Sequence, residues 1–146
     1  MRWNPTERLA RGGLVLAMIA ATVIGSAAVP AAAAVDSPAA LASSADPQLG
    51  TFLTDAQGMT LYLFTKDVPG ISNCYDQCAT NWPPLLTQGN PVLPDGLPGV
   101  VGTTVRKDGS VQATYNGWPL YYWINDHNPG DTTGQNVGGV WFVVNP

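Results

Sequence analysis

Two cysteines are the most reactive side chains in this sequence. Cys74 and Cys78 lie in the stretch CYDQC, and the chain has no other cysteine. In an oxidising compartment an even number of cysteines predicts a disulfide, which here would close a short loop. The alternative is a soft-metal site, in which the two thiolates with Met59 or His127 would bind copper. We favour the disulfide, and we expect neither a bound metal nor a cofactor.

A second group of candidate ligands lies in the stretch NDHNPGDTTG, residues 125–134. Asp126, Asn128 and Asp131 carry oxygen ligands that could bind Ca²⁺, but the stretch lacks the EF-hand pattern and a downstream Glu. We therefore prefer a turn in which Asp and Asn side chains bond to the backbone. His127 is the only histidine, and we expect it at the surface.

Catalytic signatures are absent from the sequence. A Ser-His-Asp triad would have to combine His127 with Ser72 or Ser110, and neither serine lies in a Gly-x-Ser-x-Gly elbow. There is no phosphate-binding loop and no dinucleotide fingerprint. Two aspartates could act as acid and base, as in glycosidases, but the spacing marks no pair. We predict that the protein is not an enzyme.

One seven-residue pattern occurs twice, as LYLFTKD (61–67) and LYYWIND (120–126). Six matches at one constant offset of 59 residues predict an internal duplication. Two copies are too few for a solenoid, so we expect them to pack together as pseudo-symmetric halves. The matched pairs are Gly58 with Gly117, Leu61 with Leu120, Tyr62 with Tyr121, Phe64 with Trp123, Asp67 with Asp126, and Trp82 with Trp141.

The repeated residues allow two interpretations. Along a strand, positions i and i+2 face the same side, and the aspartates would follow the strand ends, next to Pro-Gly pairs. The aspartates could therefore fix turns by accepting backbone N–H bonds while the aromatic side chains pack in a core. Alternatively, the aromatic faces could form a ligand platform. This candidate binding surface comprises Tyr62, Phe64, Asp67, Trp82, Tyr121, Trp123, Asp126 and Trp141.

Frequent turn signals separate short apolar stretches, which predicts an all-β fold. Strands are expected at residues 50–54, 59–65, 100–106, 111–115, 118–124 and 140–144, and Asn116-Gly117 predicts a type I′ hairpin turn. Residues 81–99 are proline-rich and are expected to form a loop. We predict one sandwich- or barrel-like domain at 48–146, built from two β-hairpin-rich repeats at about 49–87 and 108–146.

The N-terminal region has the pattern of a secretory signal peptide, with three arginines, an apolar run and then small residues. We expect cleavage after Ala34, a disordered linker at 35–47, and no membrane span in the mature chain. Beyond residue 34, three basic residues face nine aspartates, a formal net charge of −6. Such a chain repels phosphate, so nucleic acid and anionic membranes are not expected partners.

The sequence resembles a family of bacterial secreted or lipid-anchored proteins with a repeated Tyr-x-(Phe/Trp/Tyr)-x-x-Asp motif. That motif occurs here at Tyr62–Asp67 and at Tyr121–Asp126, and the likeness covers nearly all of residues 49–146. The resemblance implies a secreted domain of the cell envelope whose function is unassigned. Many relatives look like lipoproteins with a cysteine at the cleavage site, and this chain has none there, which favours release.

Taken together, these features predict a secreted, non-catalytic binding or structural module of the bacterial envelope, with an envelope or extracellular partner that the sequence does not identify. The alternative is an envelope redox or copper-handling protein that uses Cys74 and Cys78. A third hypothesis, a hydrolase with two carboxylates, would need both to face one cleft.

Overall fold

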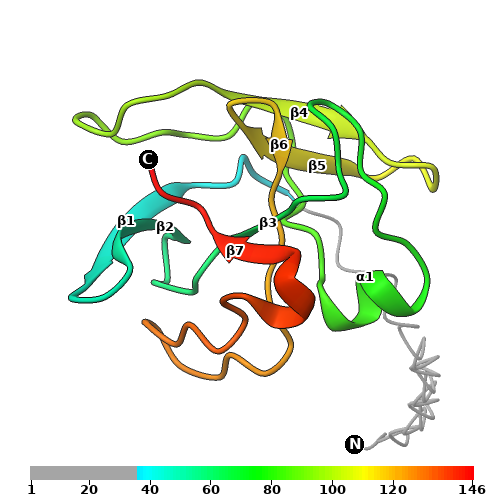
Figure 1. Ribbon diagram of the computed structural model, residues 1–146. Coiled ribbons are helices and arrows are strands. Elements are labelled where there is room, and N and C mark those ends of the chain that lie inside the picture. The colour runs from blue at the N-terminus through cyan, green and yellow to red at the C-terminus, as the bar shows by residue number, and fades with distance from the viewer. Residues whose placement is uncertain (1–35) are drawn as a thin grey trace, which may run out of the picture. The chain divides into compact units, whose positions relative to one another are not determined.

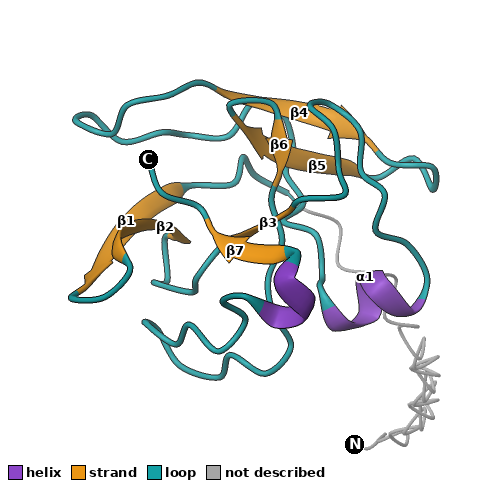
Figure 2. Ribbon diagram, viewed as in Figure 1, coloured by secondary structure: helices purple, strands orange, loops and turns teal. Residues whose placement is uncertain are grey.

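The protein is described by a computed structural model for residues 36–146 (Figure 1). The expected signal peptide, residues 1–34, lies outside the described residues. Within residues 36–146 there are seven strands, one short α-helix and one 3-10 helix, so the all-β prediction is confirmed (Figure 2). The elements are β1 (Leu41–Asp46), β2 (Gly50–Asp55), β3 (Tyr62–Phe64), α1 (Gln77–Asn81), β4 (Val101–Val105), β5 (Val111–Tyr115), β6 (Trp118–Pro119), η1 (Val137–Gly139) and β7 (Trp141–Val143).

The strands form three small antiparallel sheets, with the orders β1-β2, β3-β7 and β4-β5-β6. Within residues 36–146 these sheets do not close into a barrel. Tight turns make the hairpins possible. Asn116 and Gly117 connect β5 to β6 with φ values of 48° and 83°, the left-handed pair that a type I′ turn requires.

The prediction of a disordered linker at residues 35–47 is wrong, because strand β1 lies within that range. It pairs with β2 along its whole length, from Leu41 opposite Asp55 to Asp46 opposite Gly50. Leu41 is buried, and its N–H donates to the carbonyl of Val92 at 2.9 Å. The sequence LASSAD is composed mainly of small residues, so it gave no apolar alternation from which a strand could be predicted. The folded domain therefore begins before residue 48.

The two repeats exchange their last strands. Strand β7, from the second repeat, pairs with β3 of the first, so that Trp141 lies opposite Phe64. In the matching place Pro84, from the first repeat, forms a β-bridge with Tyr121 of the second. The matched bonds from Thr65 N–H to Val140 O (2.8 Å) and from Ile124 N–H to Asn81 O (3.0 Å) continue these ladders. The predicted pseudo-symmetric halves are thus interlocked.

The interior contains two groups of buried apolar side chains. Both combine residues of the two repeats, so the core belongs to the domain and not to either copy. One group is mostly aliphatic and contains Leu41, Leu53, Leu61, Leu85, Ala113, Tyr115, Leu120 and Val144. The other is mostly aromatic and contains Phe52, Tyr62, Phe64, Cys74, Trp82, Tyr121, Trp141 and Val143.

Candidate functional site

The repeated tyrosines and aspartates form two crossed hydrogen bonds. The Tyr62 hydroxyl donates to Asp126 Oδ2 at 2.5 Å, and the Tyr121 hydroxyl donates to Asp67 Oδ2 at 2.7 Å. Between these pairs, the backbones of Tyr62 and Tyr121 exchange hydrogen bonds of 2.8 and 3.0 Å. Burial raises the pKa of both tyrosines, and the adjacent carboxylate adds to this effect. Each motif therefore bonds to the other copy rather than to itself.

The second oxygen of each carboxylate fixes a turn in its own repeat. Asp67 Oδ1 accepts the N–H of Asn73 at 2.7 Å. Asp126 Oδ1 accepts both the N–H of Thr133, at 2.9 Å, and its hydroxyl, at 2.6 Å. The turn-fixing interpretation is confirmed. Both carboxylates are buried and fully bonded, so this pair does not face the open cleft that the hydrolase hypothesis needs.

The repeated aromatic residues form a stack inside the domain. The rings of Trp82 and Trp141 lie 3.9 Å apart at an angle of 4°, and each has an outer partner: Trp123 stacks on Trp82 at 4.0 Å, and Phe64 on Trp141 at 4.3 Å. Tyr62 meets Trp82 edge-on. Of the eight residues of the candidate binding surface, only Trp123 is not buried. These residues form a core, not an exposed platform.

Arg106 is a buried cation that the sequence did not identify. Its guanidinium donates to Ser72 Oγ (2.9 Å), to Gln112 Oε1 (2.8 Å) and to the carbonyl of Cys74 (2.6 Å). Ser72 Oγ in turn bonds to the Tyr121 hydroxyl at 2.7 Å. This cation belongs to the Tyr121–Asp67 network. The Tyr62–Asp126 network has no counterpart of it, since position 47, which matches Arg106 at the repeat offset, holds Pro47.

Asp67 carries its charge close to this cation. Burial raises the pKa of Asp67, while the hydrogen bonds from Tyr121 and Asn73 and the charge of Arg106 lower it. The bond of the Arg106 guanidinium to Ser72, and of Ser72 to Tyr121, places a positive charge at one end of the network that ends on Asp67. Arg106 thus compensates part of the cost of burying a carboxylate.

The two cysteines form a disulfide, as expected from the sequence. Because the two sulfur atoms are bonded to each other, neither cysteine offers a free thiolate to a metal. Cys74 is also fully buried, and Cys78 is half-buried. No group of three His, Cys, Asp or Glu residues that could hold a metal ion occurs in residues 36–146.

The proposed calcium ligands do not converge. Asp126 points into the core, whereas Asp131 Oδ2 accepts the N–H groups of His127 and Asn128, both at 2.9 Å. Those bonds lower the pKa of Asp131. His127 is exposed, as expected. The stretch is therefore the Asx turn that the sequence favoured.

A third Tyr–Asp pair, formed by the buried Asp55 and the half-buried Tyr122, is not part of the repeat. Asp55 ends β2, and its Oδ1 accepts the N–H groups of Gln57 and Met59, both at 2.9 Å. Its Oδ2 accepts the hydroxyl of Tyr122 at 2.9 Å. Burial, followed by the charge of Asp55, raises the pKa of Tyr122. The sequence contained both residues but gave no reason to pair them, because they are 67 positions apart.

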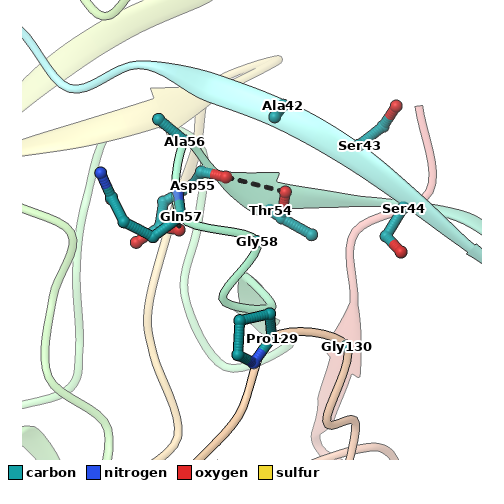
Figure 3. Close-up of a pocket in the computed structure, with 10 residues that line it drawn as sticks. All are labelled: Ala42, Ser43, Ser44, Thr54, Asp55, Ala56, Gln57, Gly58, Pro129 and Gly130. Carbon is teal, nitrogen blue, oxygen red and sulfur yellow. Dashed lines mark hydrogen bonds between the residues drawn. The ribbon is translucent and has the colours of Figure 1, made fainter.

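Two surface depressions meet at the turn that follows Asp55, with Ala56 and Gln57 lining both. The larger, of about 450 Å³, lies between β1, the end of β2 and the Pro129-Gly130 segment (Figure 3). The smaller, of about 280 Å³, extends along residues 37–40 to Tyr122. Pro129 lines the larger depression and packs against Gly58, where a Cβ would lie 3.0 Å from the proline Cβ.

The fold and these contacts define a small, disulfide-bonded β domain made by duplication. A family described as a secreted repeat of unknown function matches this chain twice, at residues 43–86 and 102–145. The matches cover more than half of the chain, so the protein belongs to this family and is an extracytoplasmic protein. Each match begins six residues before the repeat bounds expected from the sequence and therefore includes most of β1 or β4. No curated protein and no solved structure matches the chain.

Proposed function

We propose that the protein is a secreted, non-catalytic binding module of the bacterial cell envelope, and that it binds through the two depressions beside Asp55. The observation that carries this proposal is the position of the Asp55–Tyr122 pair. Residues 36–146 contain no helix that is long and apolar enough to span a bilayer.

The duplication distinguishes contacts that hold the two halves together from contacts that occur in one copy only. A contact made twice, once in each copy, holds the two halves together. Neither member of the Asp55–Tyr122 pair is duplicated, because the offset of 59 places Thr114 and Leu63 at the matching positions. The Asp55 carboxylate and the Tyr122 hydroxyl beside these depressions are therefore present in one copy and absent from the matching positions of the other. Such a copy-specific polar surface is the place where a ligand can be recognised.

The lining groups disfavour an anionic ligand, because the one charged side chain from residues 36–146 that lines the depressions is the carboxylate of Asp55. Ser43 and Gln57 are exposed at the larger depression and offer neutral donors and acceptors, and the half-buried Tyr122 offers an aromatic ring at the smaller one. No cation lines either depression, and residues 36–146 have a formal net charge of −6. An anionic polymer would be repelled. We propose neutral, hydroxyl-rich glycan chains of the cell wall as the ligand class.

The internal contacts support a role without catalysis. Ser72 is bonded to Arg106 and Tyr121, and the hydroxyl of Ser110 donates to Asp108 at 2.6 Å. Among residues 36–146, neither serine is hydrogen-bonded to His127. The two repeated carboxylates, Asp67 and Asp126, accept the hydrogen bonds that fix the turns described above.

A redox or copper-handling role would require the disulfide to open in use. The contacts around it favour a structural bridge, because Cys74 is buried and its carbonyl accepts a hydrogen bond from Arg106. We expect both cysteines of the secreted protein to resist alkylation until strong reductant is added. Free alkylation of the native protein would instead favour the redox role, and copper titration would then test it.

The binding proposal is tested with chitooligosaccharides and with purified cell-wall sacculi as probes. Ala56→Trp places a large ring where both depressions meet, at an exposed position. Ala45→Trp is the matched control, since Ala45 is exposed on β1 and lines neither depression. We expect the control to bind like the natural protein and Ala56→Trp to lose at least tenfold in affinity. Equal binding by both variants, or no binding of either probe by the natural protein, would refute the proposal.

A further inference from the structure

Strand β4 has an open edge. It is the outer strand of the β4-β5-β6 sheet and pairs only with β5 among residues 36–146 (Figure 1). Strand β4 forms its hydrogen bonds to β5 through the even-numbered residues of β4. At one end of the ladder Asn116 N–H donates to Val100 O (2.7 Å), and at the other end Arg106 N–H donates to Ser110 O (2.8 Å). In an antiparallel ladder the intervening residues point their N–H and C=O groups the opposite way. Val101, Thr103 and Val105 therefore present theirs on the open side.

This edge lacks the features that normally protect an exposed strand. Residues 100–105 read VVGTTV and contain no Lys, no Pro and no charge. Val100 is 72% exposed and Val105 is 70% exposed. The edge of β1 is different, because Val92 covers its first residue and Asp46 ends it. The β4 edge is thus the more favourable template for an added strand.

A second apolar segment lies beside β4. The hydroxyl of Thr104 donates to the carbonyl of Gly70, which brings the turn at 68–71 next to the strand. Val68 and Ile71 in this turn are 46% and 56% exposed. Four of the six large apolar side chains that are exposed in residues 36–146 therefore lie on or next to β4. A partner at this edge can cover part of this exposed apolar area.

We propose that β4 pairs with β4 of a second copy of this chain, so that two three-stranded sheets join into one. The pattern of the strand selects this partner. In an antiparallel pair centred on Thr103, that residue lies opposite itself and Val101 lies opposite Val105 of the other copy. Such β-branched pairs stabilise neighbouring strands. The contact is isologous and closes as a dimer, with about six backbone hydrogen bonds between the chains.

The same register avoids charge repulsion between the two copies. The charged residues nearest the strand are Lys107 and Asp108, which would lie opposite Gly99 and Pro98. Arg106 is buried and bonded inside its own chain. The pairing therefore brings no like charges together, although each copy carries a formal net charge of −6 over residues 36–146.

The test uses opposite charges at the centre of the pair. Thr103 is exposed, and its backbone groups face the open edge, so Thr103→Lys and Thr103→Glu leave the bonds to β5 in place. The expected result is a dimer for the natural protein, a monomer for each variant alone, and a heterodimer when the two are mixed. Thr51→Lys, an exposed position on β2, is the matched control and remains dimeric. Sedimentation velocity at high micromolar concentration measures these masses.

Two outcomes would overturn this proposal. One is a natural protein that stays monomeric at high micromolar concentration, in which case an open edge of this kind would serve a strand of different sequence. The other is a dimer that survives both charge substitutions, which would place the interface elsewhere. The result is independent of the glycan proposal, because Thr103 lines neither depression.

Discussion

Replacement of Tyr62 by Phe isolates one of the two crossed bonds between the repeats. The change removes a hydroxyl that donates to Asp126 at 2.5 Å and accepts the N–H of Gly134 at 3.1 Å. A hydrogen bond to a charged group contributes about 1.5–3 kcal/mol, and a buried N–H left without a partner costs about 1 kcal/mol or more. Asp126 keeps its two bonds from Thr133. We therefore expect Tyr62→Phe to lower the free energy of unfolding by about 3 kcal/mol.

For a domain of this size about 1 kcal/mol corresponds to roughly 4 °C in Tm, so the melting temperature should fall by about 12 °C. Urea unfolding followed by tryptophan fluorescence measures the free energy directly, because the Trp82–Trp141 stack reports on the interface. The control is Tyr75→Phe, since Tyr75 is half-buried and its hydroxyl only accepts the N–H of Lys107 at 3.1 Å. A loss for Tyr62→Phe no larger than the loss for this control would refute the reasoning.

A double-mutant cycle identifies the partner of the lost bond. Tyr62→Phe and Asp126→Asn are made singly and together. Because the two groups share one hydrogen bond, their effects should be non-additive by about 1–3 kcal/mol. The same cycle with Tyr62→Phe and Asp67→Asn should be additive within about 0.5 kcal/mol, since Asp67 bonds to Tyr121 instead. Reversal of these two results would mean that the motifs bond within a copy.

Three further predictions follow from other contacts. Reduction of the Cys74–Cys78 disulfide, which links residues four positions apart, should lower the free energy of unfolding by about 2 kcal/mol; an unchanged urea midpoint would contradict this. Gly134→Ala should lower the free energy of unfolding by about 1–3 kcal/mol, because its Cβ would lie 2.8 Å from Tyr62 and 2.9 Å from Trp82. A Tm within about 2 °C of the natural value, roughly the measurement error, would be inconsistent with that packing. Burial raises the pKa of Tyr62, Tyr121 and Tyr122, so the folded state keeps their protons. Their contribution to stability is complete below about pH 10, the ordinary pKa of tyrosine, and decreases above it by about 4 kcal/mol per pH unit for the three together. Tyrosinate absorbance should therefore rise together with unfolding, and ionisation of all five tyrosines before unfolding would argue against this linkage.

The constant offset of 59 was sufficient to predict the duplication, because matched residue types need no knowledge of three-dimensional contacts. It could not predict that the motifs cross. A Tyr five residues before an Asp is compatible with a bond inside one copy and with a bond to the other. Periodicity identifies the face on which a side chain lies, and it does not identify the partner. The strand exchange between β3 and β7 decides between these possibilities.

Two other features depend on contacts that are distant in sequence. Strand β1 is held by its register with β2 and by the bond from Leu41 to Val92, so its small residues form a strand without strong β propensity. Arg106 is buried because three acceptors, on Ser72, Cys74 and Gln112, surround it. A charged residue beside a turn is normally exposed, and only its partners show otherwise.

The crossed arrangement also explains why function has to be sought away from the repeated motif. Since the repeated Tyr and Asp residues and the Trp82–Trp141 stack are buried between the two copies, a ligand could reach them only by separating the halves. The features present in one copy divide into two kinds. The disulfide and Arg106 lie within the core beside the Tyr121–Asp67 network. The Asp55–Tyr122 pair and the β4 edge instead lie at the surface, which is why we propose these two features as the places where the duplicated domain binds other molecules.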